Sequence, residues 1–351
     1  MRISLFLVSC TATLFLVACL ACEVPEGGQD ILIMSYNLQT LFDPVDQGGE
    51  YEEFRVSTGS WNDSLYEARL KALSTSIHGA SFPAGSGAGP DVLVVQEAEN
   101  TRVLRDLAAS LGGYPYIVAA EEEESTLGCG IISRLPVVGS KAHRVRKPDG
   151  APASVPRFIL EAELETAHGR LIVMATHLKS KLGGAMETEP ERQAAAALVG
   201  ALVARRLAGN PDLAIVVAGD FNENPDEFER VDGAYPTALM SPDAGVGPWL
   251  LISNDMEDLQ PGSELPILYC PWTDSGGYSY RFQGEKERID QILMSSGLAP
   301  GGSGRLVFMS FSAEPPEFIV SDSGQPLEWD TWSASGYSDH LPIRVLLTGK
   351  P

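Results

Sequence analysis

The sequence predicts a protein of mixed α and β structure, and three observations support this fold class. Short apolar runs of strand length recur along the chain, as at 91–95 and 213–217. Longer segments such as 189–207 carry apolar residues at the spacing of a helix. The strands first alternate with helices and later follow one another through short turns. This order indicates one α/β domain in which a mixed sheet is covered by helices.

The individual elements follow from the same patterns in chain order. Helices are expected at 64–79, 101–111 and 189–207. The first of them carries apolar residues such as Leu73 and Ile77 at helical spacing, and the third is rich in Ala. Gly169 predicts the turn of a hairpin between two strands. Strands are expected at 31–36, 91–95, 116–119, 128–133, 136–144, 158–165, 170–176, 213–217, 278–282, 291–294, 306–309 and 343–347.

Two further segments have unusual composition. Charged and uncharged residues alternate from Lys141 to Lys147, which favours a solvated strand at the edge of a sheet. The segment 224–276 is dense in Pro, Gly and Asp, so we expect a long loop there that is either functional or disordered.

Composition limits the classes of function. With 44% hydrophobic residues the chain can build an ordinary packed core. A formal net charge of −22 argues against a protein that grips long nucleic acid through general electrostatics. A locally positive cleft or a divalent metal can still override this field at short range. Cys129 and Cys270 could pair in an oxidising compartment, or remain buried thiols.

The N-terminus predicts export. Arg2 precedes an apolar stretch that is typical of a secretory signal and too short for a membrane span. Leu16-Val17-Ala18-Cys19 resembles a bacterial lipobox, in which the cysteine is lipidated. We therefore expect a signal peptide at 1–18, a tether at 19–30 and a lipoprotein anchored through Cys19 to a membrane of the bacterial cell envelope. The alternative is a plain cleaved signal peptide with Cys19 discarded.

The most informative feature is a set of polar motifs that close or directly follow apolar runs. Carboxylates, amides and imidazoles at strand ends are the groups that Mg²⁺-assisted hydrolysis of a phosphate ester requires. One such motif is weak evidence, but six in order are specific. The motifs are Asn37, Gln96-Glu97, His177, Gly219-Asp220-Phe221-Asn222, Arg288-Ile289-Asp290 and Ser338-Asp339-His340.

In this order the motifs resemble the endonuclease/exonuclease/phosphatase superfamily, which includes deoxyribonuclease I. The resemblance extends over 31–347, and its strongest parts read "DVLVVQEAEN", "VVAGDFNENP" and "YSDHLPI". It implies one domain at 31–349 and a four-layer sandwich, in which two packed mixed β-sheets are flanked by helices. The periodicity alone predicts only α plus β.

The resemblance also implies roles for the motif residues. Asp220 would orient or deprotonate the attacking water, and Asn222 would bind phosphate or metal oxygens. His177 would stabilise charge on the phosphate or protonate the leaving group. Asp290 would hold His340 in one tautomer for acid–base catalysis. The proposed ligands of Mg²⁺ or Mn²⁺ are Asn37, Glu97 and Asp339.

Three basic residues are candidates for substrate binding. Lys179 follows His177 closely and could act as a point charge on the phosphate. Arg157 and Arg192 could also contact phosphate, although surface salt bridges are the more common role of such residues.

The leading hypothesis is therefore a metal-dependent phosphoester hydrolase, an extracytoplasmic nuclease or phosphodiesterase acting on nucleic acid or nucleotides. A sphingomyelinase-like phospholipase is an alternative, suggested by His177 and by the aromatic residues Tyr269, Trp272, Tyr278 and Tyr280. A non-catalytic surface lipoprotein that binds a partner is the third possibility. No obligate protein partner is evident in the sequence.

Overall fold

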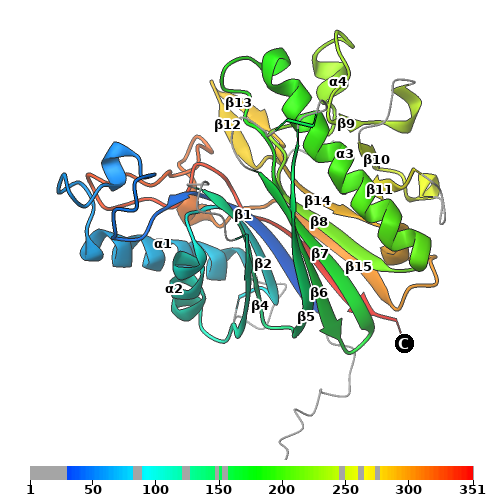
Figure 1. Ribbon diagram of the computed structural model, residues 1–351, viewed down its shortest axis with the longest axis horizontal. Coiled ribbons are helices and arrows are strands. Elements are labelled where there is room, and N and C mark those ends of the chain that lie inside the picture. Colours follow the sequence, from blue (N-terminus) through cyan, green and yellow to red (C-terminus); the bar gives the residue numbers. More distant parts are fainter. Residues whose placement is uncertain are drawn as a thin grey trace, which may run out of the picture.

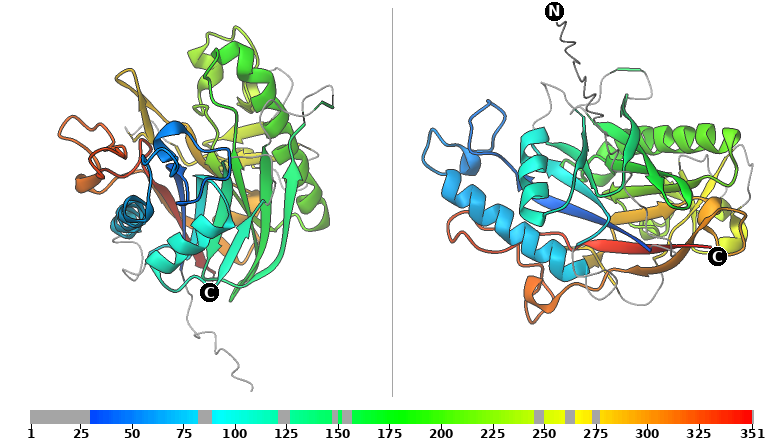
Figure 2. Two further views of the ribbon diagram at one scale, coloured as in Figure 1. Left: turned by 60° about the vertical axis from the view of Figure 1, so that its left-hand side comes forward. Right: turned by 90° about the horizontal axis from the view of Figure 1, so that it is seen from below.

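A computed structural model describes residues 30–81, 89–120, 127–146, 150–151, 157–244, 250–259, 265–272 and 277–350. Two large β-sheets pack face to face, and helices cover their outer faces (Figure 1). α1 (Asp63–Ser81) and α2 (Thr101–Leu111) lie against one sheet, and α3 (Ala185–Gly209) lies against the other (Figures 1 and 2). The expected four-layer sandwich is confirmed.

The first sheet contains six strands and carries the N-terminal part of the chain. β1 is parallel to β2 and antiparallel to β16, so the sheet is mixed. Its order is β15 (Leu306–Ser312), β16 (Ile343–Gly349), β1 (Ile31–Leu41), β2 (Val92–Ala98), β4 (Gly128–Ser133) and β3 (Tyr116–Ala119).

The second sheet contains eight strands and is also mixed. β7 is parallel to β8, and β14 is antiparallel to β8. Its order is β5 (Val137–Arg144), β6 (Phe158–Thr166), β7 (Gly169–His177), β8 (Ala214–Asp220), β14 (Asp290–Met294), β11 (Ile267–Tyr269), β10 (Leu250–Ser253) and β9 (Leu239–Met240).

The remaining elements are short. β12 (Tyr280–Phe282) and β13 (Glu285–Glu287) form a separate hairpin, and α4 (Glu227–Arg230) is a single helical turn. Short 3-10 helices lie at Glu52–Phe54, Pro242–Ala244, Met256–Asp258, Ser296–Leu298 and Glu317–Ile319.

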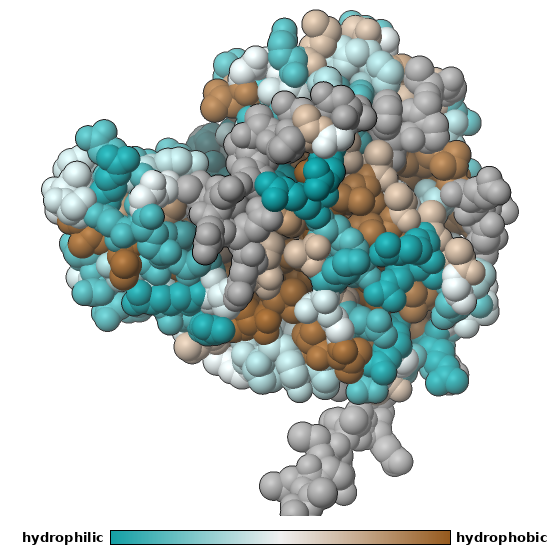
Figure 3. All heavy atoms as spheres, viewed as in Figure 1, coloured by the Kyte–Doolittle hydropathy of each residue, from teal (hydrophilic) through white to brown (hydrophobic). Residues whose placement is uncertain are grey.

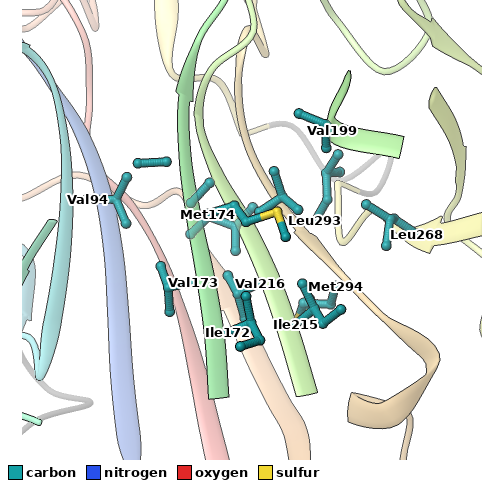
Figure 4. Packing of buried hydrophobic residues seen from close by; sticks show 14 of the residues in the cluster. Val94, Ile172, Val173, Met174, Val199, Ile215, Val216, Leu268, Leu293 and Met294 are labelled. Carbon is teal, nitrogen blue, oxygen red and sulfur yellow. The ribbon is translucent and has the colours of Figure 1, made fainter. Parts of the chain in front are cut away.

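The alternation of side chains along the strands builds two layers of core. In β1 and β2, Ile33 and Val94 face the second sheet, while Met34 and Val95 pack under α1 and α2. Strands buried on both faces read as continuous apolar runs, as these do. Figure 4 shows Val94 and Val199 of α3 on opposite sides of the strands of the second sheet.

Several expected elements agree closely with the structure. The helix at 101–111 and the strands at 116–119 and 128–133 have the expected bounds. Thr166 pairs with Gly169 across a two-residue turn, which confirms the hairpin. β5 lies at the edge of its sheet, with Lys141 and Arg144 exposed, which confirms the expected edge strand.

Other expectations need correction. The segment 224–276 is not a plain loop, because α4, β9, β10 and β11 lie within it and extend the second sheet. Of the two alternatives for Cys129 and Cys270, the structure agrees with the buried thiols, because both cysteines are free and buried. No helix in the described ranges has the length and apolarity that a membrane crossing requires. The predicted signal peptide and Cys19 lie outside the described residues.

Exposed apolar side chains are scattered. The face in Figure 3 shows hydrophobic residues in separate patches with hydrophilic residues between them. Leu182, Phe282 and Trp332 are among the exposed large apolar residues, and they lie in different segments of the chain.

Candidate active site

One edge of the two sheets collects the polar motifs. Parallel strands end at the same edge of a sheet, so β1 and β2 bring Asn37 and Glu97 together, and β7 and β8 do the same for His177 and Asp220. β14 runs antiparallel to β8 and therefore begins at this edge, with Asp290 as its first residue. The turn before β16 adds residues 338–340.

Strand register places three of these side chains side by side. Asp220 pairs with His177 on one side and with Asp290 on the other. Residues directly opposite each other in neighbouring strands project from the same face of a sheet. His177, Asp220 and Asp290 therefore form a row across the second sheet, and all three are buried.

Asp290 and His340 form a buried pair. Asp290 Oδ2 lies 2.8 Å from His340 Nδ1, and His340 Nε2 lies 3.9 Å from Asp220 Oδ2. Burial lowers the pKa of His340, but the negative charges of Asp290, Asp339 and Asp220 outweigh it and raise the pKa well above its ordinary value. A buried imidazolium therefore faces the centre of the site, oriented by Asp290.

Asp220 is the central carboxylate. Its Oδ2 lies 3.5 Å from His177 Nε2 and accepts a hydrogen bond of 3.1 Å from Asn37 Nδ2. Burial raises the pKa of Asp220 to about 7, with the His340 charge opposing this shift. A carboxylate with a pKa near neutrality is suited to accept a proton.

His177 is held in the neutral form. Burial lowers its pKa well below the ordinary value, and the charges of Arg157, His340 and Lys179 lower it further. A neutral imidazole can donate one hydrogen bond to a phosphate oxygen but is a poor proton donor. Of the two roles expected for His177, this geometry favours charge stabilisation.

Glu97 and Asn222 have left-handed backbones, with φ of 62° and 52°. Such conformations are strained for residues other than Gly and are common at functional sites. Glu97 Oε2 accepts the Thr40 N–H at 2.9 Å, and Asn222 N–H donates to Asp220 Oδ1 at 2.8 Å. These left-handed backbone conformations therefore orient Glu97 and Asn222 in the site.

The residues present fit a hard divalent cation. Asp220, Asp290 and His340 place their potential ligand atoms within 4.8 Å of one another, and because a protonated His340 has no lone pair for a metal, the carboxylates are the groups available to a cation. Asp290 Oδ1 is buried without a hydrogen-bond partner among the described residues, which is costly unless another group binds there. Burial and the charge of Asp339 raise the pKa of Glu97, as expected where carboxylates crowd at a cation site.

Asn37 is oriented against the expected role of metal ligand. Its Nδ2 donates to both Glu97 Oε1 and Asp220 Oδ2 at 3.1 Å, and its Oδ1 accepts the Gln39 N–H at 3.0 Å. The amide oxygen thus points to the backbone. In this structure Asn37 bridges two carboxylates instead of offering an oxygen to a cation.

The three basic residues have different surroundings. Arg157 and His177 line a small pocket beside the site, together with Phe158 and Cys129. Arg157 Nε has no hydrogen-bond partner within the described part of the chain, and the charges of Arg157 and Lys179 act on His177. Both cations are therefore close enough to attract an anionic substrate.

Arg192 does not agree with its expected role in substrate binding. Its side chain is 0% exposed and makes ion pairs of 2.7 Å with Glu189 and 2.9 Å with Glu223. It also donates to the carbonyl of Lys179 at 3.1 Å. These contacts occupy the guanidinium. Arg192 therefore stabilises the segment that contains Lys179 from the protein interior.

Two residues near the site make contacts that were not expected from the sequence. The ring of Tyr280 packs on His340, with ring centroids 4.6 Å apart. Ser338 Oγ donates to the Asn37 carbonyl at 2.7 Å and accepts the His340 N–H at 3.1 Å, which ties β1 to the loop before β16. Ser338 belongs to the Ser-Asp-His motif, but nothing in the sequence indicates that Tyr280 stacks on a histidine.

Two mixed sheets between helical layers, with acidic and imidazole groups at one edge, define the deoxyribonuclease I-like α/β sandwich. The chain belongs to the endonuclease/exonuclease/phosphatase family, whose profile matches residues 32–235. Members of this superfamily are typically metal-dependent phosphoesterases. A search among curated proteins gave no significant match.

Solved structures share the fold at low sequence identity. An endonuclease/exonuclease/phosphatase family protein from Bacteroides thetaiotaomicron has 16% identity and a TM-score of 0.56, covering 92% of this chain and 96% of that chain. TDP2 from Caenorhabditis elegans has 16% identity and a TM-score of 0.54, covering 92% of this chain and 75% of that chain. TDP2 from D. rerio, in complex with a single-strand DNA product, has 16% identity and a TM-score of 0.51, covering 91% and 98% of the two chains.

Proposed function

We propose that this protein is a divalent-metal-dependent hydrolase of phosphodiester bonds, acting outside the cytoplasm as a nuclease or general phosphodiesterase. The observation that carries the proposal is the buried row of His177, Asp220 and Asp290, closed by His340. Family membership supports the reaction class. The N-terminal apolar stretch and Cys19 support export and a lipid anchor.

The site residues can take different roles in hydrolysis. Asp220 is placed to take a proton from the attacking water, because its pKa of about 7 makes it a base near neutral pH. The His340 imidazolium, oriented by Asp290, donates a hydrogen bond to a phosphoryl oxygen and can protonate the leaving oxygen. Neutral His177 donates a hydrogen bond to the same phosphate.

Glu97 and Asp339 are the residues that would hold Mg²⁺ or Mn²⁺. When bound, such an ion polarises a phosphoryl oxygen and neutralises its charge. Lys179 and Arg157 draw the anionic substrate to the edge of an otherwise acidic protein.

Purified protein tests the proposal directly. We expect Mg²⁺ or Mn²⁺ to support hydrolysis of bis-nitrophenyl phosphate, EDTA to abolish it, and plasmid, RNA and sphingomyelin to identify the natural substrate class. His340→Ala should lower kcat by about 10²- to 10⁴-fold. His168→Ala is the matched control, because His168 lies in the turn at the opposite end of β7. A folded protein without activity on any substrate would support a non-catalytic binding role.

A phospholipase remains the second candidate because of one observation. Phe282 is 55% exposed and stands on the same hairpin as Tyr280, which packs on His340. An apolar side chain presented there could contact lipid. The other aromatic residues that suggested this activity are less favourable, since Trp272 and Tyr278 are buried.

A further inference from the structure

Arg69 is a buried cation on α1 beneath the candidate site. Its side chain is 0% exposed, and none of the described Asp or Glu residues forms an ion pair with it. Burial lowers the pKa of Arg69 to about 10, so the guanidinium stays charged at neutral pH. An isolated buried charge is costly, and a fold retains it only where its surroundings compensate.

The compensation comes from backbone carbonyls at the end of β1 and in the loop before β16. Nη2 of Arg69 donates to the carbonyl of Leu38 and, at 3.2 Å, to that of Gln39, directly after Asn37. Nη1 donates to the carbonyl of Tyr337, two residues before Asp339. One planar guanidinium thus joins the end of β1 to the loop before β16, and its forked donors suit this role.

Both segments held by Arg69 also contact residues of the proposed cation site. Gln39 and Thr40 have left-handed backbones, with φ of 49° and 57°, and in that conformation the Thr40 N–H donates to Glu97 Oε2 at 2.9 Å. On the other side, Ser338 follows Tyr337 and links Asn37 to His340. The charge of Arg69 is also attracted by Asp339 and Glu97.

A third contact fixes the guanidinium itself. It lies over the ring of Trp329, 5.1 Å from the centroid, and the Gln39 side chain accepts the Trp329 N–H at 2.7 Å. Trp329 belongs to the same C-terminal loop as Asp339. The end of β1 and the loop before β16 are therefore joined twice, once through Arg69 and once through Gln39.

We propose that Arg69 is a positioning residue that holds the end of β1, which contacts Glu97, and the Asp339 loop at the spacing a divalent cation needs and supplies a fixed positive charge beneath them. The inference rests on the proposed metal-dependent function. Arg69 lies on α1, a helix that carries none of the polar motifs, and from there it would organise the proposed metal ligands. Residues that orient metal ligands typically change affinity by about 10- to 100-fold when replaced.

Metal binding without substrate tests this role. Arg69→Lys keeps the charge but cannot reach three carbonyls at once. We expect isothermal titration calorimetry with Mn²⁺ to show affinity reduced by about 10-fold or more, while circular dichroism shows a folded protein. Arg344→Lys is the matched control, because buried Arg344 donates at 3.0 Å to the Glu314 carbonyl, in a segment without site residues. Its Mn²⁺ affinity should equal that of the wild type.

The outcomes are distinct. Wild-type Mn²⁺ affinity in Arg69→Lys would overturn the inference, even if the melting temperature falls, because it would mean that Arg69 only stabilises the fold. If Arg69→Lys does not fold, Gln39→Ala tests the same loop with Arg69 in place, and unchanged affinity there overturns the inference. Absence of Mn²⁺ binding and of hydrolysis in the wild type would overturn the proposed function together with the inference.

Discussion

Asp290 is the residue on which the orientation of His340 depends. Its Oδ2 contacts Nδ1 of the imidazole, which leaves Nε2 facing Asp220 and the site. Its other oxygen, Oδ1, is buried and has no hydrogen-bond partner in the described ranges. The carboxylate therefore fixes one ring orientation, and it contributes much of the charge that keeps His340 protonated.

Replacement of Asp290 by Asn removes the negative charge of the side chain while keeping its shape. We expect Asp290→Asn to lower kcat on a phosphodiester by about 10²-fold or more, because the amide stabilises the imidazolium poorly and can select the other tautomer. Steady-state kinetics should show the effect in kcat more than in KM. Asp212→Asn is the control, since Asp212 contacts Ser303 at the far end of β8. Near-normal kcat in Asp290→Asn would contradict the assigned role.

Single residues also show the limit of motif reasoning. The motif around Asp220 predicts a strand-end carboxylate from local sequence alone, and β8 ends there. For Arg192 a surface salt bridge is the more common expectation, and the residue does form ion pairs, but in the interior, with Glu189 and Glu223. Glu189 lies three residues before Arg192 in α3, whereas the contact with Glu223 depends on how α3 packs, which no local pattern specifies.

Among the elements, β8 is the strand that assembles the catalytic row. It lies between β7 and β14, and its register sets Asp220 opposite both His177 and Asp290. Gly219 permits this arrangement. Its φ is 151°, and a Cβ at this position would lie 1.9 Å from the Thr176 carbonyl oxygen of β7.

A methyl group on Gly219 should disturb both the strand and the site. We expect Gly219→Ala to lower the free energy of unfolding by about 1–3 kcal/mol through overpacking, and to reduce kcat because Asp220 must move. Urea denaturation and kinetics measure the two effects. Gly139→Ala in β5 is the matched control, because its Cβ would meet only Glu163 Cβ at 3.9 Å. Equal stability of the two variants would count against the close approach of β7 and β8.

The short strands after α4 show what element-level patterns miss. β9 consists of Leu239–Met240 and is a strand only because β10 lies beside it. β11 joins these strands to β14 through a single pair, Tyr269 and Met294. The composition of 224–276 indicates turns correctly, but strands this short are stabilised by partners distant in sequence, so periodicity cannot reveal them.

At the scale of the whole molecule, a charge cluster joins the second sheet to its helical layer. Glu161 of β6 is 2% exposed and contacts His143 Nε2 at 2.8 Å and Arg206 Nε of α3 at 2.6 Å. Burial raises the pKa of Glu161, but the hydrogen bonds from Arg206 and His143 outweigh burial and leave the pKa below its ordinary value. The folded protein therefore favours the ionised carboxylate.

This cluster predicts a defined dependence of stability on pH. A carboxyl group with a depressed pKa stabilises the fold fully above its unfolded pKa of about 4.3, and the contribution is lost as pH falls through the folded value. We expect Glu161→Gln to cost about 1–2 kcal/mol at pH 7, a modest value because Arg206 is 34% exposed, and less at pH 3. Urea denaturation at both pH values, with exposed Glu165→Gln as control, measures the difference. A cost that does not change with pH would contradict the assignment.

The sequence by itself determined the fold class, most strand positions and the identity of the polar side chains at strand ends. These properties depend on period-two alternation, turn residues and short motifs, all of which are local. The tertiary structure alone decided that Asp220 lies between His177 and Asp290, that the Asn37 amide faces two carboxylates, and that Arg69 joins the end of β1 to the loop before β16. Such contacts depend on strand register and layer packing between residues that are far apart in the chain, and so they appear only when the two sheets meet.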